Sequence, residues 1–135
     1  MVEMSVQTVS RARNRALIAI LRERDGRRVI GVGLSRPGAA AVQCGLRRIR
    51  PVRPLLWRAL LHTIDVLGAR LVRTVIDRDE ADRPCAFFDV LAPAKGVIEL
   101  ACSTEDAVAL ASLGEVPLWV GESLIGRKRP WSGTA

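Results

Sequence analysis

Residues 97–114 read VIELACSTEDAVALASLG, and within this stretch the pattern changes from strand to helix. The first five residues predict a strand. Ser103 or Thr104 predicts a helix N-cap, because its hydroxyl can accept a hydrogen bond from a free backbone N–H of the first turn. Glu105 and Asp106 follow in that turn, where carboxylates interact favourably with the helix dipole. The stretch therefore predicts a strand that passes directly into a helix, which ends at the final glycine.

The rest of the chain predicts more strands than helices. Ser35 is expected to cap a second helix with Pro37 in its first turn, and Asp25-Gly26 predicts a hairpin turn. The expected strands are 5–9, 15–23, 28–34, 70–78, 84–91 and 116–120, and the other helices are 37–48 and about 54–68. This order favours an α+β fold, with a mixed or antiparallel sheet covered by about three helices. We expect one domain over 1–125 and a flexible tail over 126–135.

The composition is typical of a globular protein. Of the 135 residues, 49% are hydrophobic and 26% are charged. No apolar run approaches the ~20 residues of a membrane span, and the first residues lack the pattern of a signal peptide. We therefore expect a cytoplasmic protein with no membrane partner.

The chain is strongly basic, with a net charge of +7. Arginine carries almost all of the positive charge, since Lys95 and Lys128 are the only lysines. A basic protein can bind nucleic acid by neutralising phosphates. The basic runs at 11–15, 47–50 and 127–129 are short and scattered, so we interpret them as solvated surface. Nucleic acid is thus a possible partner but not the favoured one.

The cysteines do not form a metal-binding pattern. Cys44, Cys85 and Cys102 show no CxxC spacing, and His62 is the only histidine. A structural zinc site needs about four clustered ligands. We expect free thiols, no disulfide, no metal and no cofactor.

Three stretches carry a resemblance to a known family. Residues 53–60 read RPLLWRAL, residues 101–108 read ACSTEDAV, and residues 116–120 read VPLWV. In this order and spacing they resemble the bifunctional nuclease domain family over roughly 15–125. Members of that family typically read Arg-Pro-Leu-Thr-His-Asp-Leu at the first motif and Asp-Ser-Arg-Pro-Ser-Asp-Ala at the second. The resemblance implies a shared fold and, in relatives, metal-dependent cleavage of RNA and DNA.

Most of the polar groups of these motifs are replaced in this chain. The family's polar positions fall on Arg36, Leu56, Trp57, Arg58, Ala101 and Ser103. Only Asp106 persists, and one carboxylate does not build a two-metal site. A first-turn Asp also stabilises its own helix by ~0.3–1 kcal/mol. We favour this structural role for Asp106 over metal ligation.

The replacements predict an apolar pocket at the family's active site. Its expected walls are Leu56, Trp57, Leu61 and Trp119, and its expected polar rim is Arg36, Arg53, Arg58, His62 and Asp106. His62 lies one turn after Arg58 on the same predicted helix and could act as a base, although packing or a surface position is the more common role of a lone helical histidine. Of Phe87 and Phe88, one should face the core and the other the opposite side of the sheet.

An apolar pocket with few titratable groups suits a hydrophobic small-molecule substrate. The favoured function is cyclisation of a flexible substrate in natural-product biosynthesis, through pericyclic or cycloaddition chemistry that needs neither metal nor cofactor. One alternative is a residual nuclease that uses Asp106, Glu105 and a metal ion. Another is a non-catalytic module that binds nucleic acid. We also expect a homo-oligomer, in which the pocket could lie between subunits.

Overall fold

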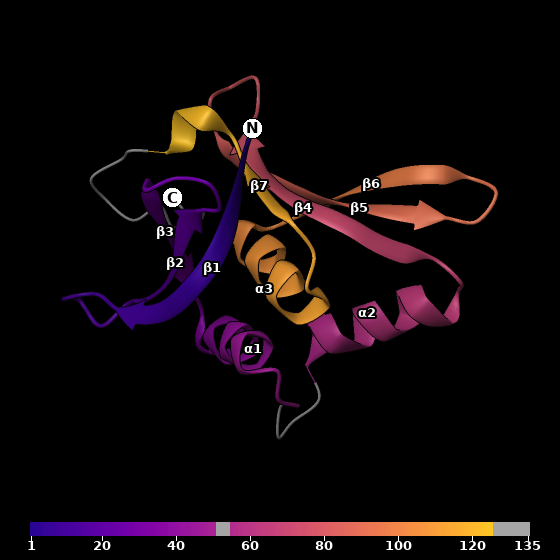
Figure 1. Ribbon diagram of the computed structural model, residues 1–135, viewed down its shortest axis with the longest axis horizontal. Coiled ribbons are helices and arrows are strands. Elements are labelled where there is room, and N and C mark those ends of the chain that lie inside the picture. Colours follow the sequence, from indigo (N-terminus) through magenta and orange to yellow (C-terminus); the bar gives the residue numbers. More distant parts are fainter. Residues whose placement is uncertain (51–54, 126–135) are drawn as a thin grey trace.

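One seven-stranded sheet and three α-helices make up an α+β fold (Figure 1). The computed structural model describes residues 1–50 and 55–125. The tail predicted at 126–135 lies outside the described residues. In chain order, the elements are β1 (Val2–Arg11), β2 (Leu17–Glu23), β3 (Val29–Leu34), α1 (Arg36–Arg47), α2 (Leu56–Val66), β4 (Arg70–Arg78), β5 (Pro84–Ala92), β6 (Gly96–Cys102), α3 (Thr104–Gly114), β7 (Leu118–Val120) and a 3₁₀ turn, η1 (Glu122–Leu124).

The last strand, β7, joins two antiparallel halves of the sheet. The strand order is β3-β2-β1-β7-β4-β5-β6. β7 pairs antiparallel with β1 and parallel with β4, so the sheet is mixed, as predicted. Hydrogen bonds at both ends of β7 fix it on β4: the Thr74 N–H donates to the Pro117 carbonyl at 3.0 Å, and the Gly121 N–H to the Ile76 carbonyl at 2.9 Å. Three residues of β7 therefore hold the two halves together.

Helix α3 lies in the middle of the molecule, between α1 and α2 (Figure 1). Most of its side chains are buried. One core cluster joins α3 to α1 and to the strands of both halves, and a second joins it to α2, β4 and β5. Within the described ranges, no helix has both the length and the apolar character that crossing a membrane requires.

The two predicted serine caps are confirmed. Ser35 Oγ accepts the Gly38 N–H at 3.1 Å, and Ser103 Oγ accepts the Asp106 N–H at 3.0 Å. Glu105 adds a bond between the helices that the sequence did not predict, since its Oε1 accepts the Ser35 N–H at 2.5 Å and the Ser35 hydroxyl at 2.6 Å. The carboxylate reaches this place because Gly38 has no side chain: a Cβ there would lie 1.9 Å from Glu105 Oε1.

The first hairpin differs from its prediction. The strand expected at 15–23 begins at Leu17, because the preceding residues form a turn. In that turn Arg15 has a φ of 66°, and the Ala16 N–H donates to Asn14 Oδ1 at 3.1 Å. β1 is longer than the expected 5–9, because it pairs with β2 along its length and with β7 near its start.

Two other elements, one helix and one strand, are shorter than predicted. The helix expected at about 54–68 spans Leu56–Val66, and Gly68 follows it with a φ of 74°, a conformation that glycine adopts readily. The strand expected at 116–120 begins at Leu118, because the Val116 N–H donates back to the Ala111 carbonyl of α3 at 3.2 Å. The remaining elements agree with their predicted bounds to within one residue.

Helices α1 and α3 cross at Gly45, where a Cβ would lie 2.5 Å from the backbone of Ser112. We predict that Gly45→Ala lowers the free energy of unfolding by ~1–3 kcal/mol, because overpacking a close crossing forces the backbone apart. At a free helical site the same substitution stabilises by ~1 kcal/mol. Urea unfolding followed by circular dichroism measures the change.

Gln43→Ala is the matched control, since Gln43 is exposed on the same helix. It should change the free energy of unfolding by less than ~0.5 kcal/mol. A Gly45→Ala protein as stable as the wild type would contradict the close crossing of α1 and α3.

Candidate functional site

The beginnings of α2 and α3 meet through one hydrogen bond. Trp57 lies in the first turn of α2, and its Nε1–H donates to Asp106 Oδ1 at 2.8 Å. The other oxygen, Asp106 Oδ2, accepts the Ser103 N–H at 3.1 Å and completes the capping box of α3. Both oxygens of the carboxylate are therefore bound to N–H donors of the protein.

A small apolar pocket lies beside this hydrogen bond. Its volume is about 230 Å³. Residues from α2, β5, β6 and α3 form its walls: Leu56, Trp57, Leu60, Phe88, Ala101, Cys102, Asp106 and Leu110. Leu56 lies at the edge of the pocket with 83% of its surface exposed, which is unusual for a leucine. Asp106 is the only charged residue in the wall.

The thiol of Cys102 lies in the wall of this pocket. Burial, and secondarily the negative charge of Asp106, raises the pKa of Cys102 to about 12. Because the thiolate is the reactive form of cysteine, this thiol is protonated and unreactive at neutral pH. The pocket therefore presents a neutral sulfur and apolar carbon next to a carboxylate that already has its partners.

The structure brings together some of the predicted pocket residues and separates others. Leu56, Trp57 and Asp106 line one pocket. Leu61 instead packs against two core clusters. Trp119 lies outside this pocket. Its two neighbours in β7 are in the core, and side chains alternate along a strand, so Trp119 faces the opposite side of the sheet. There it lies opposite Val75 of β4.

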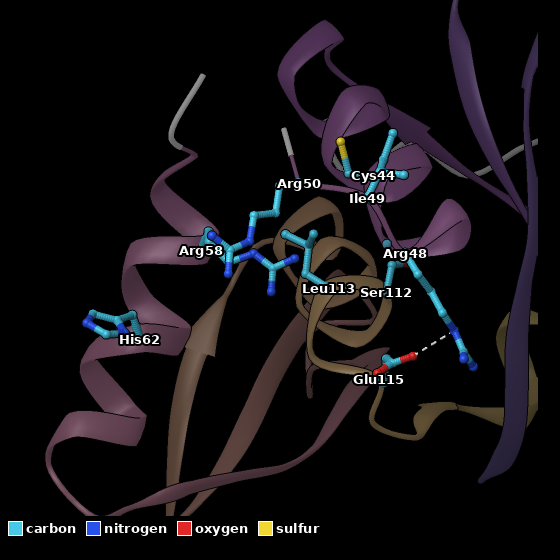
Figure 2. Close-up of a pocket in the computed structure, with 10 residues that line it drawn as sticks. Cys44, Arg48, Ile49, Arg50, Arg58, His62, Ser112, Leu113 and Glu115 are labelled. Carbon is cyan, nitrogen blue, oxygen red and sulfur yellow. Dashed lines mark ion pairs between the residues drawn. The ribbon is translucent and has the colours of Figure 1, made fainter. Parts of the chain in front are cut away.

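The predicted rim residues do not surround this pocket. Arg36 is an exposed residue at the start of α1, and Arg53 lies outside the described residues. Arg58 and His62 line a different and larger hollow of about 680 Å³ (Figure 2). The His62 ring points away from the Arg58 side chain (Figure 2), which argues against His62 acting as a base next to Arg58. Of the described rim residues, Asp106 alone belongs to the apolar pocket.

Comparison with known proteins gives a family match. The family model of the bifunctional nuclease domain matches residues 19–130. The chain belongs to the bifunctional nuclease domain family. No curated protein matches the sequence. The match covers the three stretches on which the resemblance was based, so the predicted family is confirmed.

This member of the bifunctional nuclease domain family offers no evident metal centre in the described residues. No group of three or more His, Cys, Asp or Glu side chains is placed to hold a metal ion there. Glu105 and Asp106 are adjacent in sequence, but Glu105 binds Ser35 of α1 whereas Asp106 binds Trp57 and Ser103. The two carboxylates therefore bind groups from different parts of the fold and are not placed to share one metal ion.

Five of the eight residues of the pocket wall were missed by the sequence-based prediction. The missed residues are Leu60, Phe88, Ala101, Cys102 and Leu110. Alternation predicts that Phe87 and Phe88 face opposite sides, but only the placement of β5 shows that Phe88 is the core residue. Leu60 had a usable signal, because it lies near Trp57 on the same face of a helix.

We predict that Cys102 is alkylated slowly in the folded protein. The pKa of Cys102 is raised from 9.0 to about 12. Below pH 9, its thiolate fraction is therefore about a thousandth of that of an ordinary cysteine, since each pKa unit changes this fraction about tenfold. Iodoacetamide labelling at pH 8.5, followed by peptide mass spectrometry, should show at least a ~100-fold slower reaction than in urea. The rate should continue to rise with pH towards 12. A Cys102 that reacts equally fast in the folded and unfolded chains would contradict the assignment.

Proposed function

We propose that this chain has lost metal-dependent hydrolysis and binds an apolar small molecule in the pocket beside Trp57. The hydrogen bond from Trp57 to Asp106 carries the proposal. By the resemblance, Trp57 replaces the family's histidine, and Asp106 is the one family carboxylate that remains. The indole N–H binds one oxygen of this carboxylate, and the Ser103 N–H of the helix cap binds the other. A carboxylate with both oxygens engaged in this way is poorly suited to bind a metal ion.

The proposed reaction is cyclisation of a flexible apolar substrate without metal or cofactor. The pocket wall has a neutral thiol and one carboxylate that is already hydrogen-bonded, so it lacks a free acid–base pair. Holding a chain in its reactive conformation can by itself lower a barrier by several kcal/mol. We further propose a cytoplasmic location, which the free thiols of Cys44, Cys85 and Cys102 support.

We also propose that a second copy of the chain completes the pocket. Pockets for drug-sized ligands usually measure ~300–1,000 Å³, so 230 Å³ holds only part of such a ligand. β6 is the last strand of the sheet, and its exposed apolar residues are Val97, Ile98 and Leu100. An apolar strand with an unpaired edge favours pairing with another strand. Antiparallel pairing of β6 with its copy would cover this edge and extend the pocket wall.

Two alternatives use nucleic acid. A residual nuclease requires Asp106 and Glu105 to leave their present partners and share a metal ion. A nucleic-acid-binding module is favoured by the net charge of +7 and by the arginines of the larger hollow. Incubating single-stranded RNA and DNA with the protein, with and without Mn²⁺, tests the first alternative. Binding that falls steeply between low and moderate salt would support the second.

We predict that the neutral dye Nile red binds the protein and that Trp57→Ala weakens this binding about tenfold, equivalent to ~1.4 kcal/mol. Trp57→Phe should bind nearly as well, because it keeps an apolar ring in the wall. Trp119→Ala is the matched control and should leave dye binding unchanged, since Trp119 is outside the pocket. Dye fluorescence measures binding, with EDTA present to exclude metal.

Unchanged dye binding by Trp57→Ala would contradict the pocket assignment. Cleavage of RNA or DNA that disappears in Asp106→Ala would favour the residual nuclease instead.

We predict a dimer that Leu100→Lys disrupts, because a lysine on the edge strand places like charges at the proposed contact. Light scattering after size exclusion should give about twice the chain mass of 14.7 kDa for the wild type and the single mass for the variant. Val29→Lys is the control, since Val29 is exposed on β3 at the opposite edge of the sheet. A monomeric wild type would refute the second copy.

A further inference from the structure

The larger hollow lies where two helices end. α1 ends beside it at Arg47, α3 ends at Gly114, and α2 forms the opposite side (Figure 2). The lining residues that matter here are Arg48, Ile49, Arg50, Arg58, Leu113 and Glu115. No residue lines both this hollow and the apolar pocket. It is therefore a separate place on the molecule.

Positive charge exceeds negative charge in this hollow. Three arginines line it against one glutamate. Arg48 pairs with Glu115 at 3.1 Å, which leaves the guanidinium groups of Arg50 and Arg58. Neither of these two arginines forms an ion pair with any residue in the described ranges.

The two remaining guanidinium groups belong to the same hollow. Arg50, from the segment that follows α1, and Arg58, from α2, both line it together with Leu113 (Figure 2). Like charges that share a hollow repel one another, and an anion bound between them removes this repulsion. The carboxyl ends of α1 and α3 carry partial negative charge that offsets part of this repulsion. Arg48 and Glu115, which directly follow these two ends, already pair with each other.

We propose that Arg50 and Arg58 bind the terminal phosphate of a small ligand. Guanidinium groups bind phosphate through paired N–H donors, and two of them match a dianion in charge. Leu113 and Ile49 provide apolar surface for the rest of the ligand. Glu115 and Arg48 neutralise each other on the other side of the hollow, so the remaining positive charge there matches one terminal phosphate rather than a continuous strand of phosphodiesters. The site thus selects a phosphate monoester at the end of a molecule.

The test compares a monoester with a diester. Isothermal titration of phenyl phosphate should show saturable binding with a dissociation constant below ~1 mM, and diphenyl phosphate should bind at least tenfold more weakly. Arg58→Gln and Arg50→Gln should each weaken phenyl phosphate binding about tenfold. Arg58→Lys, which keeps the charge but loses the paired donors, should fall between wild type and Arg58→Gln.

Arg13→Gln is the matched control, since Arg13 is an exposed arginine in the turn between β1 and β2 and loses the same charge. Circular dichroism and Nile red binding show that each variant is folded, and they separate this site from the apolar pocket. Arg50 and Arg58 variants that bind like Arg13→Gln would overturn the proposal. Equal binding of 5′-hydroxyl and 5′-phosphate oligonucleotides would also overturn it, in favour of a nucleic-acid strand.

Discussion

The burial of α3 is the constraint on which the rest of the structure depends. This helix contacts both halves of the sheet and the other two helices, so few of its side chains reach water. Its free N–H groups at the start must find partners within the protein. Ser103 and Asp106 supply them through the capping box, and Glu105 reaches across to the start of α1. One turn of helix therefore fixes both the position of α3 and the position of α1 relative to it.

That constraint gives Asp106 a structural role that does not depend on any chemistry in the pocket. As a helix cap, it keeps one oxygen on the Ser103 N–H whatever lies in the pocket. The Trp57 indole occupies the other oxygen, and the same ring forms part of the apolar wall. One side chain, Trp57, thus both satisfies the carboxylate and contributes to the apolar surface.

Local patterns predicted the fold well, and long-range placement was the part they could not supply. The serine caps, the hairpins and most element bounds follow from residues a few positions apart. The central place of β7 does not, because a three-residue strand has no signal for its partners. The lack of long-range information also explains the misplaced prediction for Trp119. The face of the sheet on which Trp119 lies depends on how β7 pairs with β1 and β4. The same lack of information explains why sequence patterns did not separate Arg58 and His62, which line the larger hollow, from the residues of the apolar pocket.

The orientation of α2 about its own axis explains why Arg58 lies outside the apolar pocket. Successive residues of an α-helix project about 100° apart, so adjacent residues can face different surfaces. Trp57 faces α3 and the apolar pocket, whereas Arg58 faces the hollow at the ends of α1 and α3. The helix thus separates an apolar surface from a basic one. Two separate ligands, or one ligand with two distinct ends, match these two surfaces.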